Sequence, residues 1–403
     1  MSYGTLFLLV ASGIVGPLLA GLRGLAIPMI FGEIAAGVVI GKTGFNCLPT
    51  GDPTVGFLSM VGLAMLQFLV GMRLPLRDAN LHNDVKQGLI ATTLVCILSV
   101  PLGMLFANWA GFGHWSMFAV MFAASSAAIV MPIIYEMKLS GEMLLRTISW
   151  VVLADITSVI AMSVAMSTGS TLTAIFGSLL VVAAAAGASV LLKWFFKQEI
   201  GDYYRHLSWE KAWALDLRLS LLLLLGLCWL AQSFGVSILI AGFAAGAVVS
   251  ILDMPSRLTK QLMGLGEGFF VPLFFVDLGA QLDFRALCSP DLFALAILLW
   301  LATLAIHLLV SKLVHLPASA GLIATAQKGV SAAIVSLGLA SGALNSGQGA
   351  AIILAMLLAL ITCSVGAGMM AKTEVEQPQG MILPQQTQTN VASSVEVYDD
   401  GDD

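Results

Sequence analysis

Residues 145–167 read LRTISWVVLADITSVIAMSVAMS, an apolar stretch with a single carboxylate, Asp155, near its centre. A helix that spans a bilayer needs about 20 apolar residues. At the rise of an α-helix, Asp155 lies about 14 Å along such a helix from Arg146, close to the bilayer midplane. An ionised group at this depth costs several kcal/mol, so it is seldom retained without a function. The stretch therefore predicts a membrane carrier whose ion- or proton-binding group is Asp155.

The whole chain has the composition of a polytopic membrane protein. Of its 403 residues, 59% are hydrophobic and 10% are charged, whereas soluble globular proteins carry about 25% charged residues. The five cysteines lie far apart and form no CxxC or Cys/His cluster, so neither a disulfide framework nor a zinc site is indicated. We expect no cofactor, no metal beyond a transported monovalent cation and no nucleic-acid partner.

We predict an all-α membrane protein with thirteen spans in contact with lipid. The spans are 4–21, 25–41, 55–73, 87–109, 115–136, 146–168, 171–194, 213–233, 236–252, 266–284, 291–314, 317–342 and 347–371. Basic residues test this count, because cytoplasmic loops carry an excess of Lys and Arg. Of the 18 bases, Arg218 and Lys328 lie inside spans, Lys42 and Arg285 lie in even-numbered connections, and the other fourteen flank the opposite side. We therefore expect the N-terminus outside and the C-terminus in the cytoplasm.

The charged segment 193–213 divides the chain into two groups of six spans. Residues 1–168 form the first group, 169–212 the bridging span with a cytoplasmic loop, and 213–371 the second group. Two six-span halves that enter the membrane from opposite sides are inverted repeats, an arrangement common among secondary transporters. Residues 372–403 are acidic and rich in glutamine, and we expect them to form a disordered cytoplasmic tail.

The fifth span of each half is interrupted by small polar residues. AASSAAIVMP contains Ser125, Ser126 and Pro132, and ATAQKGVSAAIVSLG contains Lys328 and Gly329. Pro132 removes a backbone donor, and broken helices at mid-membrane present carbonyl groups and helix ends that hold ions. Alternatively, the serines bond to their own helix and Pro132 only kinks it. Because both halves carry an interruption, we expect two crossed broken helices, with breaks at Pro132 and Gly329.

Six segments, in order along residues 4–371, resemble motifs of the monovalent cation:proton antiporter superfamily. They are GEIAAGVVIGKTG (32–44), VGLAMLQFLVGMRL (61–74), SSAAIVMPIIYEMKL (125–139), LADITSV (153–159), GFFVPLFFVDLGAQLD (268–283) and AQKGVSAAIVSLGLASG (326–342). The nearest branch contains Kef-type potassium efflux systems and bacterial sodium/proton antiporters. The resemblance implies an elevator-like, alternating-access homodimer in the bacterial inner membrane, with a dimerisation domain built from the first two or three spans of each half. A Kef-like gate would have to be a separate cytosolic subunit.

The resemblance also assigns the binding residues. Asp155 corresponds to the family's essential carboxylate, which binds the cation or the proton but never both. Ala154 stands where relatives often have Asp, Asn or Gln, and a single carboxylate suggests one cation per proton. The hydroxyl groups of Ser125, Ser126 and Thr157 are further candidate ligands, because monovalent cations prefer oxygen. The choice between sodium and potassium stays open.

Three other charged residues lie inside predicted spans. Lys328 is about 16 Å into its span and is expected to compensate charge when no cation is bound, with a fixed structural partner as the alternative. Asp277 has three interpretations: an ion pair with Lys328, a second carboxylate of the cation site, or a pore-facing acid. We favour the ion pair, since two unpaired buried charges are costly. Glu33 matches the family's Gly-Glu pair, in a structural role or in a cytoplasmic vestibule.

The sequence thus predicts a secondary active transporter that exchanges sodium or potassium for protons. One alternative is a sodium-coupled carrier of organic anions, in which Lys328 is the substrate's counter-charge. The other is a membrane sensor that no longer transports and therefore tolerates Asp155→Asn. An enzyme is not expected, because no nucleophile–base pair and no metal motif appears in the sequence.

Overall fold

The computed structural model describes residues 2–21, 28–48, 51–73, 79–110, 114–137, 139–165, 171–197, 213–252 and 256–375, with single positions between 203 and 211. In these residues every regular element is a helix. Eleven helical segments are long and apolar enough to cross a membrane, and Met29–Ile40 and Ile238–Ile251 are shorter apolar helices. These thirteen apolar segments match the thirteen predicted spans one to one. The match confirms the predicted all-α membrane fold.

The helices follow the predicted order. The first half contains α1 (Tyr3–Gly13), α2 (Val15–Ala20), α3 (Met29–Ile40), α4 (Pro53–Met72), α5 (Ala79–Ala110), α6 (Trp115–Ala123), α7 (Ala127–Glu136) and α8 (Glu142–Ala165). Helix α9 (Thr171–Phe196) is the bridging span. The second half contains α11 (Leu215–Ser233), α12 (Ile238–Ile251), α13 (Ser256–Leu265), the π-helix η1 (Gly266–Phe270), α14 (Val271–Gln281), the 3-10 helix η2 (Phe284–Cys288), α15 (Pro290–Leu313), α16 (Ala318–Ala324), α17 (Gly329–Ala340) and α18 (Ser346–Val375).

Several helix ends carry the capping residues that local sequence favours. The Asp52 side chain accepts from the Thr54 backbone N–H at 2.8 Å, and Pro53 opens α4 with the φ angle that a first helical turn needs. Ser237 caps α12 in the same way, accepting from the Leu239 N–H. Helix α18 runs past its predicted apolar span: it continues to Val375, whereas the span was predicted to end at 371. Most of the predicted tail, residues 376–403, lies outside the described residues.

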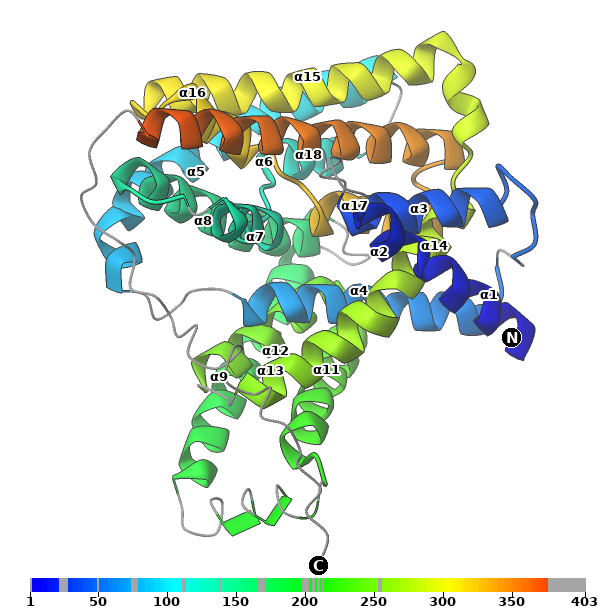
Figure 1. The fold of residues 1–403 in the computed structure, drawn as a ribbon, viewed down its shortest axis with the longest axis vertical. Helices are drawn as coiled ribbons and strands as arrows, with labels where there is room; N and C mark the ends of the chain where they lie inside the picture. Colours follow the sequence, from blue (N-terminus) through cyan, green and yellow to red (C-terminus); the bar gives the residue numbers. More distant parts are fainter. Residues whose placement is uncertain are drawn as a thin grey trace, which may run out of the picture.

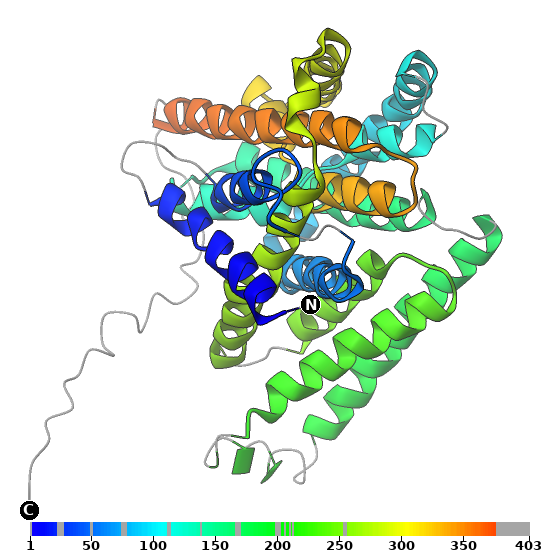
Figure 2. The same cartoon turned by 90° about the vertical axis from the view of Figure 1, so that its right-hand side faces the viewer.

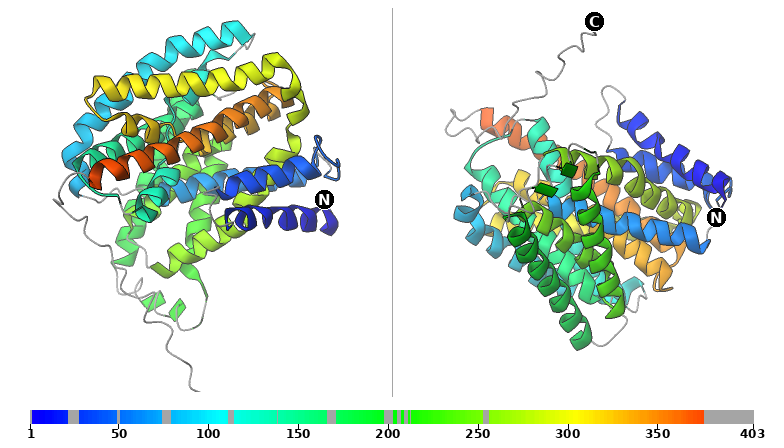
Figure 3. Two further views of the ribbon diagram at one scale, coloured as in Figure 1. Left: turned by 45° about the horizontal axis from the view of Figure 1, so that its top comes forward. Right: turned by 90° about the horizontal axis from the view of Figure 1, so that it is seen from below.

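The helices divide into two bundles. We call α5–α8 with α15–α18 the core bundle, and α1–α4 with α11–α14 the scaffold bundle, because the main helix contacts fall within each set. In Figure 1 the core helices α15, α16 and α18 lie above the scaffold helices α4, α11, α12 and α13. Helices α9 and α11 lie side by side at one edge (Figure 2), and α15 runs beside α18 across the core bundle (Figure 3).

Glycines bring the scaffold helices into backbone contact. A Cβ atom at Gly246 of α12 would meet the Phe68 carbonyl of α4, and one at Gly37 of α3 would meet the Val276 carbonyl of α14. Small residues at such crossings let helix backbones approach closely inside a membrane. The scaffold therefore packs as a tight unit against which the core bundle rests.

Candidate functional site

Both helices that were predicted to be broken are interrupted, and the two interruptions meet. Helix α6 ends at Ala123 and α7 begins at Ala127, with Ala124 in an extended conformation between them. Helix α16 ends at Ala324 and α17 begins at Gly329. The Gln327 side-chain Nε2 donates to the Met121 carbonyl at the end of α6, at 2.8 Å. The two unwound segments are thus linked directly through a side-chain amide.

Asp155 lies at the first of these breaks. Its carboxylate projects from α8 and is 4% exposed, and its Oδ2 accepts from the Ala127 backbone N–H at 2.9 Å. Ala127 is the first residue of α7, so its N–H has no partner within the helix. A helix N-terminus also carries partial positive charge, which favours an anionic group beside it. The structure therefore holds the predicted carboxylate against an unwound backbone inside the core bundle.

Two of the three predicted hydroxyl ligands lie in the same break. Ser125 and Ser126 are both buried. The Ser125 Oγ has no hydrogen-bond partner among the described residues, which leaves its oxygen available. Thr157 does not share this face, because residues two apart on an α-helix lie about 200° apart around its axis. The structure gives no support to grouping Thr157 with Asp155.

The predicted break at Pro132 is wrong, whereas the predicted break at Gly329 is correct. Pro132 lies on the exposed side of α7, after the helix has already begun at Ala127. The chain unwinds earlier, where Asp155 rather than another helical turn takes up the Ala127 N–H. Gly329 opens α17, and a Cβ atom there would lie 2.8 Å from the Gln67 Nε2. Because α4 approaches α17 this closely, position 329 requires glycine.

Lys328 lies at the second break but does not pair with Asp277. Its Nζ lies 5.9 Å from the centre of the Phe275 ring, and the carboxylates that interact with it electrostatically are those of Glu33 and Glu267. Asp277 instead accepts from the Gln281 Nε2 at 2.8 Å and interacts with the Ser59 hydroxyl. The favoured Asp277–Lys328 ion pair is therefore absent from the described conformation.

Glu33 is a buried acid in the scaffold. It is 5% exposed, and Gly16 packs so closely against it that a Cβ atom at Gly16 would lie 2.7 Å from the Glu33 Cγ. Its Oε2 has no hydrogen-bond partner among the described residues. Nearby, Arg73 of α4 and Glu267 of η1 form an ion pair. These groups form an acidic region of the scaffold that faces Lys328.

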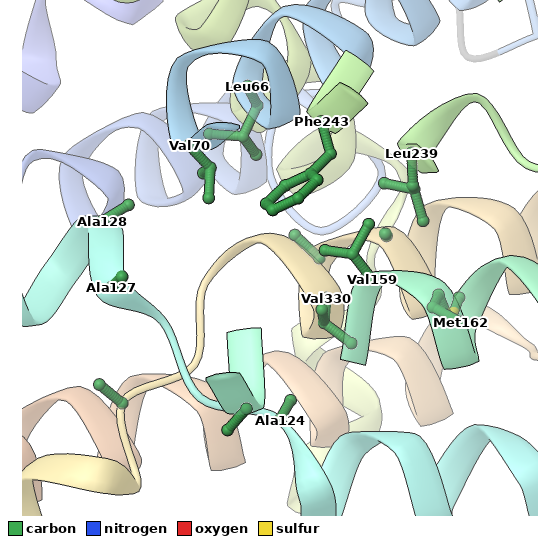
Figure 4. Close-up of a cluster of buried hydrophobic side chains, with 14 of the residues drawn as sticks. Leu66, Val70, Ala124, Ala127, Ala128, Val159, Met162, Leu239, Phe243 and Val330 are labelled. Carbon is green, nitrogen blue, oxygen red and sulfur yellow. The ribbon is translucent and has the colours of Figure 1, made fainter. Parts of the chain in front are cut away.

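The two bundles meet at an apolar seam beside the breaks. Figure 4 shows Leu66, Val70 and Phe243 of the scaffold gathered with buried core residues, of which Ala124, Ala127, Ala128, Val159, Met162 and Val330 are labelled. All of these side chains are buried. The seam therefore covers the break with buried apolar side chains.

Two amide side chains inside predicted spans make contacts whose partners the sequence did not specify. Gln327 links the breaks, and its Oε1 also accepts from the Ser331 Oγ at 2.6 Å. Gln67 reaches Gly329 from the scaffold. The signal in the sequence was an amide side chain in the middle of an apolar span, where lipid offers no hydrogen-bond partner; Gln327 finds its partners in the protein, whereas the Gln67 Nε2 has none among the described residues.

Comparison with known proteins identifies the family. A family model described as "Sodium/hydrogen exchanger, transmembrane" matches residues 8–373. The chain belongs to this family. It is therefore an integral membrane protein of the sodium/hydrogen exchanger type, and its relatives are transporters rather than enzymes.

The chain is similar in sequence to several named cation transporters. YjbQ of Bacillus subtilis, assigned by inference as a Na+/H+ antiporter, is 26% identical over 338 residues, 78% of this chain and 52% of that protein. The chain thus spans about half the length of YjbQ. A Na+/H+ antiporter of Enterococcus hirae is 27% identical over 69% of this chain and 73% of its own. The glutathione-regulated potassium-efflux protein KefC of Shigella sonnei is 24% identical over 68% of this chain and 44% of its own.

Solved structures share the fold of this exchanger. The sodium proton antiporter MjNhaP1 of Methanocaldococcus jannaschii superimposes with a TM-score of 0.63, covering 93% of this chain and 99% of that one at 15% identity. At this identity the similarity establishes the fold alone. The family model and the antiporter relatives confirm the resemblance stated from the six sequence motifs, and the solved structure agrees with it in fold.

Proposed function

We propose that this exchanger moves one monovalent cation against protons by alternating access, with Asp155 as the group that binds either. The observation that carries the proposal is the buried Asp155 carboxylate at the N-terminus of α7, beside the unpartnered Ser125 hydroxyl. This arrangement offers oxygen ligands and a partial positive charge in one place, as a reversible site for a hard cation requires.

Competition at one carboxylate is sufficient for exchange. An ionised carboxylate inside a membrane is costly, so Asp155 is stabilised either by a proton or by a cation. If the core bundle moves only when Asp155 carries one of them, each passage of a cation is matched by a return passage of a proton. Because Ala154 supplies no second carboxylate, we propose that one cation exchanges for one proton.

The proposal also covers the internal repeats, the dimer interface and the orientation in the membrane. We propose that the two halves are inverted repeats, that the scaffold bundle forms a homodimer interface, and that the N-terminus lies outside the cell. The placement of the breaks in α6–α7 and α16–α17, the fifth span of each half, supports the first point. The distribution of basic residues supports the last.

The test is proton flux in proteoliposomes. Sodium, potassium and lithium are added in turn to vesicles that contain the wild type or Asp155→Asn. We expect cation-dependent proton movement in the wild type and none above background in the variant, because the amide can neither release a proton nor carry the charge that binds a cation. The cation that elicits proton movement identifies the substrate.

Asp291→Asn is the matched control, since Asp291 is an exposed acid in the first turn of α15. This variant should exchange like the wild type. Asp155→Asn that retains full exchange would refute the assigned site. A correctly inserted wild type that responds to no cation would refute cation:proton exchange itself.

A further inference from the structure

Helix α17 begins inside the protein without a cap from its own sequence. Its N-cap position is Lys328, whose side chain makes no capping hydrogen bond, and the helix runs for 12 residues from the buried Gly329. The first N–H groups of an α-helix have no partner within the helix. Buried backbone donors are nearly always paired, so the start of α17 requires an acceptor from elsewhere.

The first broken helix meets the same requirement with a side chain. The Asp155 Oδ2 accepts from the Ala127 N–H, at the first residue of α7. Asp155 belongs to α8, which lies in the same bundle as α7. Helix α17 carries no acidic residue in its first turn, so its acceptor has to come from another helix.

The side-chain amide of Gln67 lies where this acceptor is required. Gln67 is 1% exposed, and its Nε2 has no hydrogen-bond partner among the described residues. A Cβ atom at Gly329 would lie 2.8 Å from this Nε2, which places the Gly329 backbone nitrogen within about 5 Å of it. At the other end of the side chain, a Cβ atom at Gly242 of α12 would lie 3.2 Å from the Gln67 Cβ. Two glycines therefore give this side chain the room to reach α17 from α4.

An amide side chain has two orientations of almost the same shape. Half a turn about the Cγ–Cδ bond of Gln67 exchanges Nε2, which only donates, with Oε1, which accepts. In the described orientation Nε2 faces Gly329 and gains no hydrogen bond. The opposite orientation places an acceptor beside the free N–H groups of α17.

We propose that Gln67 is a positioning residue whose side-chain oxygen caps α17, so that the scaffold supplies the cap for a helix of the core bundle. Because α4 and α17 belong to different bundles, this cap is made only while the core occupies its present position on the scaffold. A side-chain cap of ordinary strength favours the capped state about fivefold. The cap therefore acts as a latch on the movement of the core. The latch, though not the cap, rests on the proposed alternating-access function.

Hydrogen–deuterium exchange tests the cap. Mass spectrometry follows the backbone amides of 329–331 in the purified wild type, in Gln67→Met and in Gln67→Glu. Methionine keeps the length of the side chain and removes the acceptor, whereas glutamate keeps an acceptor. We expect these amides to exchange about fivefold faster in Gln67→Met. In Gln67→Glu they should exchange at the wild-type rate or more slowly, because a carboxylate at a helix N-terminus is favourable.

Two controls separate a lost cap from lost packing. The first amides of α7, where Asp155 is the acceptor, should exchange alike in every variant. Gln232→Met, on the exposed face of α11, should leave α17 unchanged. Equal exchange at 329–331 in the wild type and in Gln67→Met would overturn the proposal. Faster exchange along the whole of α17 would overturn it too, as would a Gln67→Glu variant that exchanges as fast as Gln67→Met.

Transport kinetics test the latch. Gln67→Met should raise the maximal rate of cation:proton exchange by up to about fivefold, because the core leaves its present position more readily, while Gln67→Glu should be no faster than the wild type. A maximal rate of Gln67→Met at or below that of the wild type would overturn the latch. A wild type that shows the expected amide protection yet exchanges no cation would count against the proposed function and not against the cap.

Discussion

At the scale of single residues, Gly329 of the core bundle lies close against Gln67 of the scaffold. A Cβ atom at Gly329 would lie 2.8 Å from the Gln67 Nε2, closer than an unstrained contact allows. The sequence indicates why a glycine opens the second broken helix, but not that a scaffold amide occupies the space beside it. That information requires the packing of α4 against α17.

We therefore expect Gly329→Ala to lower the exchange rate by about tenfold, because overpacking at a tight contact costs about 1–3 kcal/mol. Gln67→Ala in the same chain should restore much of the rate by removing the obstructing amide. Exchange assays on the two single variants and the double variant measure this coupling. Gly368→Ala, where no atom lies within 4 Å of the added Cβ, is the control. If the losses of exchange rate in the two single variants simply add in the double variant, the two residues do not interact.

At the scale of elements, the sequence predicted both broken helices and misplaced one break. Pro132 was a reasonable candidate because proline interrupts helices, yet α7 continues through it. The chain unwinds at Ala124–Ser126, where Asp155 satisfies the first amide of α7 from another helix. A local rule could not find this position, because the residue that stabilises the break is distant in the sequence.

The link between the breaks can be tested through Gln327. Gln327→Leu removes the amide that links the breaks: the Met121 carbonyl keeps only the Ala124 N–H, and the buried Ser331 hydroxyl loses its acceptor, at a cost of about 1–3 kcal/mol. We expect a lower melting temperature of the detergent-purified protein, measured by loss of the monodisperse fraction on heating. Gln232→Leu on the exposed face of α11 should melt like the wild type. Equal melting of all three proteins would show that the link contributes no stability.

At the scale of the whole molecule, hydropathy and charge were enough to predict the spans, their order and the fold. Each predicted span has a helix in the structure, because the bilayer imposes both length and composition on every crossing. The charged partners were less predictable: Lys328 was expected to pair with Asp277, and it faces Glu33 and Glu267 instead. Which charged residues pair between the two bundles depends on the conformation of the protein, and the sequence does not specify that conformation.

Two native cysteines test the proposed orientation. Cys47 and Cys288 are exposed and lie in even-numbered connections, which should face the outside. A membrane-impermeant maleimide should therefore label the wild type in right-side-out vesicles, and label Cys47→Ser/Cys288→Ser no more than background. A cysteine placed at Lys211, in the loop expected in the cytoplasm, should react only after permeabilisation. Labelling of a cysteine at position 211, but not of Cys47 or Cys288, in intact right-side-out vesicles would show the opposite orientation.

The glycine contacts of the scaffold have a mechanical consequence. Where the Phe68 and Val276 carbonyls lie against Gly246 and Gly37, neither helix can shift without backbone atoms colliding, so the scaffold hardly deforms under load. Across the seam in Figure 4 the two bundles meet instead through buried apolar side chains, among them Leu66, Val70 and Phe243 of the scaffold. Under the proposed alternating access, displacement would therefore be taken up at this seam rather than within the scaffold.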